Sequence, residues 1–297
     1  MKGLDVRTGI KLRNILFATD FSDAANAAAP YAAELAKRHG AKLYALHVRP
    51  AVSQAVVPPE AWEGLVKAGE IEAARQSREV LRVFPGMRVE VLIAEGDLWS
   101  SLAAAIKENN IDLLVAGTRG RSGIGKFLLG SVAEEILRKA PCPVLTVGPH
   151  AEADRNRIGQ IRHILFATNF ELQSLAAAPY AISLAQDFQA SLTLLHVIEE
   201  PKEGELIIPE ELQSASMNLL HNLVSEEAEL QRAPEYIVER GAPADKILEV
   251  AAKRGADLIV LGARKPSGFP GAASHLPIAT AHKVISSAMC PVLTVRA

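Results

Sequence analysis

The sequence predicts an α/β protein built from two tandem domains, each a five-stranded parallel sheet with helices on both faces in a Rossmann-like arrangement. Two observations support this fold class. The opening segments of the two copies are identical at 20 of 36 positions without a gap. Within each copy, short apolar runs alternate with segments of helical length, and crossovers of that length join parallel strands.

The internal repeat defines the domain organisation. Three pairs of segments match between the copies: 13–48 with 162–197, 109–119 with 254–264, and 141–147 with 289–295. The period of about 148 residues is too long for a solenoid repeat and suits a duplicated domain. A polar, glycine-bounded stretch, GPHAEADRNRIGQ, separates the copies. We therefore expect a first domain at 1–148, a linker at 149–160 and a second domain at 161–297.

The first copy opens with a strand, a helix and a second strand. Residues 15–18 form a short apolar run, which is typical of a central parallel strand buried on both faces. Ser22 can cap the alanine-rich helix that follows it through His39, and Gly40 can end that helix. The second strand is expected at 42–48.

A long helix and two further strands come next. Pro59 favours a helix start, because proline suits the first helical turn, and this helix is predicted to run to about Val83. Residues 87–94 alternate apolar and polar side chains and predict the third strand. A helix is expected at 98–109, followed by a fourth buried strand at 113–116.

The last strand of each copy bears on assembly. After a glycine-bearing loop at 117–130, the first copy is predicted to end with a helix at 132–139 and a strand at 144–147. This strand and its counterpart at 292–295 are apolar, and an uncovered apolar edge is a liability that pairing removes. We expect the two strands to pair within the chain as a pseudo-dimer. Further pairing into a homodimer is left open by the sequence.

Composition narrows the class of protein. The 297 residues carry a net charge of about −2, which gives no electrostatic footprint for nucleic acid. No apolar run approaches the roughly 20 residues of a membrane span, and the N-terminus has no signal-peptide core. Only two cysteines occur, which excludes a disulfide framework. We therefore expect a soluble cytoplasmic protein that contacts neither nucleic acid nor membrane.

The loop after the fourth strand has the composition of a phosphate cradle. Five glycines let its backbone bend and approach a ligand: Gly117, Gly120, Gly123, Gly125 and Gly130. Ser131 and Val132 open a helix whose free N–H groups favour an anion, and Arg119, Arg121 and Lys126 add positive charge. The spacing is neither a Walker loop nor the dinucleotide pattern. A mobile connector with no ligand is the alternative that spacing alone leaves open.

The motif Gly-x2-Gly-x9-Gly-Ser, which begins at Gly117, resembles the universal stress protein family of the UspA type. The resemblance is strengthened by ATDFS at 18–22 and by PCPVLTV at 141–147. It covers both copies, so the chain resembles a tandem universal stress protein. It implies an adenine nucleotide alpha hydrolase-like fold and a role in the stress response.

The resemblance also implies a site for ATP, or for ADP or AMP. In this reading Val48 contacts adenine, Arg119 faces the phosphates, and Asp20 beside Thr19 lies near ribose, phosphate or a bound Mg²⁺. Residues of the loop and the next helix would hold the phosphates: Gly117, Gly120, Gly130, Ser131 and Val132. A carboxylate at a strand's carboxyl end suits a ribose hydroxyl or Mg²⁺. The alternative for Asp20 is a turn or helix-cap role alone.

The second copy departs from the pattern. Asn169 replaces Asp20, which removes a charge for a cation. Residues 265–266 are Lys-Pro where the second glycine belongs, three extra residues enter, and 278–279 are Ile-Ala in place of Gly-Ser. A β-branched residue there cannot take the positive φ that glycine permits. We expect no ordinary ATP site in this copy, although Gly268, Gly271 and His275 leave a different ligand open.

Two other residue pairs recur in both copies. His47 and His196 end the second strand of each copy, and their recurrence predicts a shared structural hydrogen bond rather than catalysis. Cys142 and Cys290 each precede a proline at the start of the last strand, and we expect buried, inert thiols.

Three functions are compatible with these observations. The first is an ATP-binding regulatory or sensor protein with at most slow hydrolysis, since no residue stands out as a general base. The second is an enzyme of phosphoryl or adenylyl transfer, which rests on fold analogy. The third is a ligand-free interaction module that uses the duplicated sheet for docking.

Overall fold

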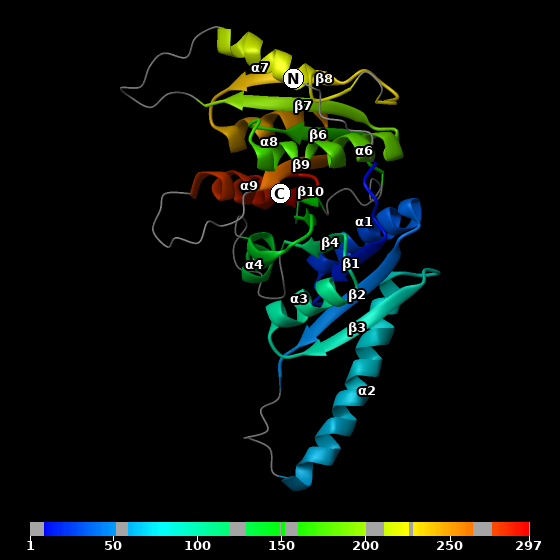
Figure 1. Cartoon of the computed structure of the whole chain (residues 1–297). Coiled ribbons are helices and arrows are strands. Elements are labelled where there is room, and N and C mark those ends of the chain that lie inside the picture. The colour runs from blue at the N-terminus through cyan, green and yellow to red at the C-terminus, as the bar shows by residue number, and fades with distance from the viewer. Residues whose placement is uncertain are drawn as a thin grey trace.

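A computed structural model describes residues 9–51, 59–118, 129–148, 150–151, 160–199, 211–225, 228–263 and 275–296. We refer to the part before residue 149 as the first half and to the part from 160 onward as the second half. Strands and helices alternate in both halves, as the sequence predicts (Figure 1).

The first half contains β1 (Asn14–Ala18), α1 (Asp23–His39), β2 (Lys42–Arg49), α2 (Pro59–Val83), β3 (Val89–Glu95), α3 (Leu98–Glu108), β4 (Leu113–Gly117), α4 (Ser131–Lys139) and β5 (Val144–Val147). The second half contains β6 (His163–Ala167), α5 (Leu172–Leu175), α6 (Ala178–Phe188), β7 (Ser191–Ile198), α7 (Glu211–His221), β8 (Glu235–Arg240), α8 (Pro243–Arg254), β9 (Leu258–Ala263), α9 (His275–Ser287) and β10 (Val292–Arg296).

The strands of both halves form one ten-stranded sheet in the order β3-β2-β1-β4-β5-β10-β9-β6-β7-β8. Neighbouring strands are parallel within each half, and β5 and β10 pair antiparallel where the halves meet. Thr146 Oγ1 donates to Val292 O at 3.1 Å, and Thr294 Oγ1 donates to Val144 O at 3.2 Å. This reciprocal arrangement is the intrachain pairing that the two apolar last strands predict.

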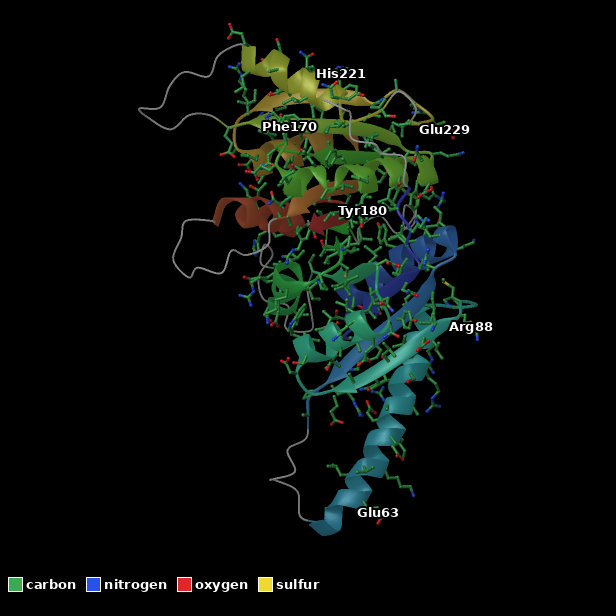
Figure 2. The ribbon with its side chains drawn as sticks, viewed as in Figure 1. Glu63, Arg88, Phe170, Tyr180, His221 and Glu229 are labelled. Atoms are coloured by element: carbon green, nitrogen blue, oxygen red, sulfur yellow. The ribbon has the colours of Figure 1, made fainter. Side chains whose placement is uncertain are left out.

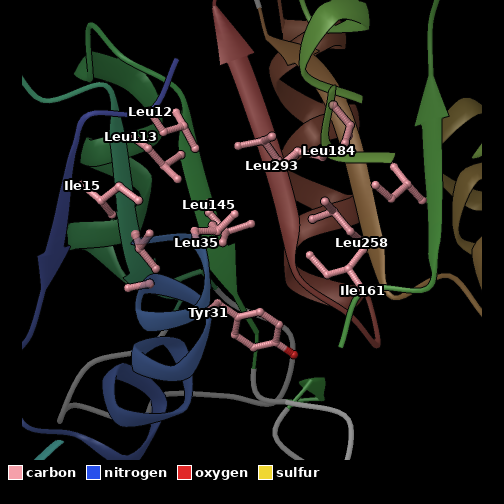
Figure 3. Packing of buried hydrophobic residues seen from close by; sticks show 14 of the residues in the cluster. Leu12, Ile15, Tyr31, Leu35, Leu113, Leu145, Ile161, Leu184, Leu258 and Leu293 are labelled. Atoms are coloured by element: carbon pink, nitrogen blue, oxygen red, sulfur yellow. The ribbon is translucent and has the colours of Figure 1, made fainter. Parts of the chain in front are cut away.

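Helices cover both faces of the sheet. One core cluster joins α1, α2, α6 and α7 to the sheet and runs across the seam between the halves, where Leu35, Leu145, Leu184 and Leu293 lie close together (Figure 3). The opposite face is covered by α3 and α4 in the first half and by α8 and α9 in the second. The α/β class with helices on both faces is therefore confirmed.

The elements begin and end close to their predicted bounds. Ser22 caps α1 by accepting from the Ala25 amide, and Gly40 ends it with φ +61°. The third strand starts at Val89 rather than at Met87, because the Met87 amide is bonded to Phe84 O in a turn around Gly86, whose φ is +73°.

The helix after the first strand of the second half is interrupted. The first half has one helix there, whereas the second half has α5 and α6 separated at residues 176–177. Pro179 stands in the first turn of α6, where its missing N–H costs nothing.

The long helix α2 leaves the body of the first half. Its C-terminal part packs through Val80 and Phe84, while its first turns are exposed and project outward, with Glu63 near the far end (Figure 2). Among the described residues no helix is both long and apolar enough to cross a membrane.

Candidate functional site

The β1–α1 junction is an ordered turn at the carboxyl end of the first strand. The Phe21 amide donates to Thr19 Oγ1 at 3.0 Å, and the Ser22 amide donates to Asp20 Oδ1 at 2.9 Å. Ser22 Oγ then accepts from the Ala25 amide at 3.2 Å. Side-chain oxygens thus fix each residue of the turn in place and hold Asp20 at the edge of the sheet.

A histidine on the neighbouring strand supports this turn. Nδ1 of His47 lies 2.8 Å from Thr19 O, and its ring lies 4.4 Å from that of Phe21. Phe21 has φ +62°, a left-handed conformation that an aromatic residue keeps only when its surroundings hold it. The second half repeats the arrangement with His196, Thr168 and Phe170. The structural role predicted for the histidine pair is the one observed.

The turn does not need the charge of Asp20. In the second half the Glu171 amide donates to Asn169 Oδ1 at 3.2 Å, in the same geometry. An amide oxygen therefore supports the turn as a carboxylate oxygen does. Asp20 therefore has the turn role that was predicted as its alternative. The negative charge of its carboxylate is not needed for that role.

Gly117 has a packing role that the sequence analysis missed. A Cβ at this residue would stand 2.6 Å from Ala24 O and 2.9 Å from Ala25 N, in the first turn of α1. Gly262 in the second half has an even closer approach to Gln173 and Ser174. Glycine near the end of the fourth strand of each half thus lets α1 in the first half and α5 in the second approach that strand at backbone contact.

The described ends of the glycine-bearing loop meet at a narrow neck. The Thr118 amide donates to Val147 O at 2.9 Å, and the Gly130 amide donates to Thr118 O at 3.0 Å. Gly130 is the N-cap of α4 and offers no side-chain cap to the helix amides that begin with Ser131 and Val132. Residues 119–128, with Arg119 and Gly120, lie outside the described residues.

The conformational reason given above for Gly130 is wrong. Its φ is −64° and its ψ is 148°, an extended conformation that any residue adopts. The contrast with Ile278 therefore does not come from a positive φ. Instead α9 begins at His275, so Ile278 lies inside a helix where its counterpart Gly130 precedes one. The remaining differences at 264–274, and the side chains of 275–279, are outside the described part of the chain.

A cleft opens between the carboxyl end of β2 and the middle of α2. It has a volume of about 1110 Å³, and Asp20, His47 and Val48 line it together with residues of α2. The structure thus brings together two of the predicted site residues, one from the β1–α1 turn and one from the end of β2. The amino end of α4 follows β4, which pairs with β1, so it opens at the same edge of the sheet.

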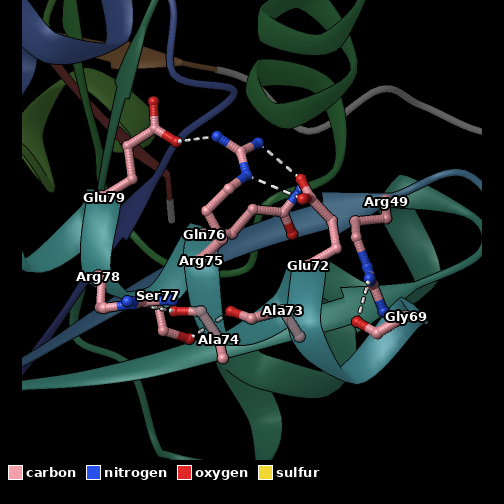
Figure 4. Close-up of polar contacts among 10 residues, drawn as sticks. All are labelled: Arg49, Gly69, Glu72, Ala73, Ala74, Arg75, Gln76, Ser77, Arg78 and Glu79. Atoms are coloured by element: carbon pink, nitrogen blue, oxygen red, sulfur yellow. Dashed lines mark hydrogen bonds and ion pairs between the residues drawn. The ribbon is translucent and has the colours of Figure 1, made fainter. Parts of the chain in front are cut away.

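The wall of this cleft carries polar side chains of α2 and of Arg49, which sequence reasoning missed (Figure 4). Arg49 Nη1 donates to Gly69 O at 2.9 Å, and Gln76 Nε2 donates to Glu72 Oε1 at 3.1 Å. The hydrogen bond from Arg75 holds the pKa of Glu72 below its usual range. Arg49 directly follows Val48 at a strand's carboxyl end, and this position is the signal that could have identified it.

Two polar atoms in this wall are buried without a partner. Nε of Arg49 and Oε1 of Gln76 make no hydrogen bond with the described residues. Buried polar groups are normally satisfied, so an unpaired donor and an unpaired acceptor beside a cleft are a reason to look for a ligand.

The profile of the universal stress protein family matches this chain twice, over residues 11–148 and 160–296. The chain belongs to the universal stress protein family. A universal stress protein of Mycolicibacterium smegmatis is 29% identical over 299 residues, which cover 95% of this chain and 96% of that protein. One of Methanocaldococcus jannaschii is 33% identical over 147 residues, which cover 48% of this chain and 86% of that protein.

A solved universal stress protein structure from Archaeoglobus fulgidus matches the whole arrangement. It superposes with a TM-score of 0.71 at 21% identity and covers 97% of this chain and 99% of its own. This likeness confirms the fold of the chain.

Both cysteines of this universal stress protein are expected to be unreactive in the folded state. Burial raises the pKa of Cys142 to about 11 and that of Cys290 to about 12, and the thiolate is the reactive species. A thiol reagent at about pH 8 should therefore modify neither residue in native protein and both in guanidinium chloride. Modification of the native chain as fast as of the unfolded chain would contradict this expectation.

Proposed function

We propose that the first half of this universal stress protein binds an adenine nucleotide and that the chain is a nucleotide-dependent regulator of the stress response. The observation that carries the proposal is the shared cleft. Asp20 and Val48, which the family resemblance assigns to ribose or cation and to adenine, line one cavity at the edge of the sheet where the amino end of α4 also opens. A helix N-terminus without a side-chain cap suits a phosphate group.

The chemistry of the cleft fits the base as well. The edge of adenine carries an amino donor next to a ring-nitrogen acceptor. Two residues that line the cleft carry one acceptor and one donor without a partner among the described residues, Oε1 of Gln76 and Nε of Arg49. The bond from Gln76 Nε2 to the ionised Glu72 fixes which end of the Gln76 amide remains to accept.

The remaining assignments extend this proposal. Gly117, Gly130, Ser131 and Val132, together with Arg119 and Gly120, would surround the phosphates. Within the described residues no three His, Cys, Asp or Glu side chains gather into a metal site. Mg²⁺ would therefore be held mainly by phosphate oxygens, with Asp20 as one protein ligand. We place the linker between the two domains at residues 149–160, a range that includes the 149–159 gap between the two family matches.

We propose slow hydrolysis at most. The histidine that lines the cleft, His47, has Nδ1 engaged with Thr19 O and its ring against Phe21, so it serves the turn. Phosphoryl or adenylyl transfer at the rates of ordinary catalysts would need a positioned base or acid.

Nucleotide binding is expected to stabilise the chain by about 2.7 kcal/mol at a free ATP concentration of about 100 Kd, because ligand binding to the native state adds to its stability. Calorimetry should give about one nucleotide per chain, and denaturation of the purified protein should release an adenine nucleotide. An unchanged melting temperature together with no heat of binding would contradict the proposal.

A matched pair of variants separates the two halves. Val48 and Val197 occupy the same place in β2 and β7, and both are half-buried. Val48→Glu should abolish ATP binding, since it places a carboxylate where the base would lie, whereas Val197→Glu should retain it. Equal loss in both variants would show that the effect is on folding rather than on the cleft.

A further inference from the structure

The neck of the glycine-bearing loop lies against the second half. A Cβ at Gly148 would stand 3.4 Å from Ile285 O and 3.8 Å from Ala288 O, at the carboxyl end of α9. Oγ1 of Thr118 is 3.8 Å from the same point. Gly148, which directly follows β5, therefore borders α9, a helix of the other half, and Thr118 lies next to Gly148.

The far end of the loop also packs into the second half. Leu129 and Ala133 are buried, and both belong to the core cluster that contains Val284, Ile285 and Ala288. Ile136 of the same helix belongs to a core cluster of the first half. Helix α4 thus has its first turn seated on the other half, and Figure 1 shows α4 beside α9.

The last turn of α4 is held from the second half as well. Arg296, at the end of β10, donates from Nη1 to Arg138 O at 2.5 Å. Arg296 occupies the position in its half that Gly148 occupies in the first, since each directly follows a VLTV segment, at 144–147 and at 292–295. The guanidinium is half-buried, and burial lowers its pKa. A cation at a helix C-terminus satisfies carbonyl groups that have no partner within the helix.

We infer that the second half is the platform that positions α4, and with it the amides that receive the nucleotide's phosphates in the first half. Val284 and Ile285 are positioning residues for the first turn of α4, and Arg296 is a positioning residue for its last turn. The second half, whose own loop has lost the family pattern, has a function in the first site. This inference rests on the proposed nucleotide binding for its affinity readout.

Val284→Ala is the test, with Val250→Ala as the matched control. Both side chains are buried in the same cluster, Val284 on α9, the helix that borders Gly148, and Val250 on α8. The two variants lose the same atoms from the same core, and denaturant unfolding of each measures the loss of overall stability, which depends on how far each site can collapse. Both are examined as full-length chains, well below their melting temperatures.

Val284→Ala should raise the Kd for ATP by about threefold to thirtyfold, the usual range for coupling between distant positions, while Val250→Ala leaves it unchanged. Hydrogen exchange should quicken at the Gly130 and Glu134 amides, which are bonded to Thr118 O and Gly130 O. Arg296→Met should produce the same two effects in a smaller degree.

Equal Kd values, or equal exchange at Gly130 and Glu134, in Val284→Ala and Val250→Ala would overturn the inference. The exchange measurement needs no nucleotide. If the wild-type chain binds no ATP, the proposed function fails, while the exchange comparison still decides whether α9 holds α4.

Discussion

Gly117→Ala and Gly262→Ala are each expected to destabilise the chain by about 3 kcal/mol, at the upper end of the usual cost of overpacking. At both positions the added methyl group meets backbone atoms rather than the end of a flexible side chain. A backbone contact of 2.6 Å at Gly117 can be relieved only if α1 moves away from β4. That movement would disturb the β1–α1 turn as well, because the same first turn carries the Ser22 cap.

Denaturant unfolding of the full chain measures this effect, with Gly64→Ala as the control. Gly64 lies within α2, and a Cβ there has nothing within 4 Å. Alanine in an exposed helix should stabilise the chain by up to about 1 kcal/mol relative to glycine. If Gly117→Ala unfolds at the same denaturant concentration as Gly64→Ala, the close crossing of α1 over β4 is not present in solution.

The fold could be predicted largely because its signals are local or repeated. The Ser22 cap and the Gly40 stop set the bounds of α1, and the apolar runs set the strands. The single continuous sheet needed one further inference. The last strand of each half is apolar, and an apolar strand at a sheet edge is expected to be paired. The interruption between α5 and α6 could not be predicted, because the equivalent helix of the first half carries a proline at the same position and remains whole.

The site was less accessible to sequence reasoning. Asp20 and Val48 were predicted from the family resemblance, and both lie near the carboxyl end of a strand. Arg49 and Gln76 were missed, since their relevance depends on α2 lying over the end of β2, which is a tertiary contact. The packing role of Gly117 was missed for the same reason: this constraint comes from a helix about 90 residues earlier in the chain. Composition shows that a glycine is present but not which neighbour requires it.

Asp20→Asn is expected to weaken the binding of Mg²⁺-ATP by about tenfold to a hundredfold, the range for losing one charged contact. The free energy of unfolding should change by no more than about 0.5 kcal/mol. The second half explains why nucleotide binding should weaken while stability does not, because Asn169 already supports the same turn through its amide oxygen. Asp20→Ala would remove the turn acceptor together with the charge, so asparagine is the informative substitution.

Calorimetry with Mg²⁺ and with a chelator separates the two ligand roles open to Asp20. A carboxylate that binds the ion loses its effect when Mg²⁺ is removed, so the variant and the wild type would then bind ATP alike. A carboxylate that accepts from ribose keeps its effect in the chelator. Asn169→Asp is the control, and it should create no second site, because α9 begins before the position that opens α4 in the first half. If Asp20→Asn binds Mg²⁺-ATP as the wild type does, the carboxylate serves the turn alone, and the charge difference between the two halves has no part in nucleotide binding.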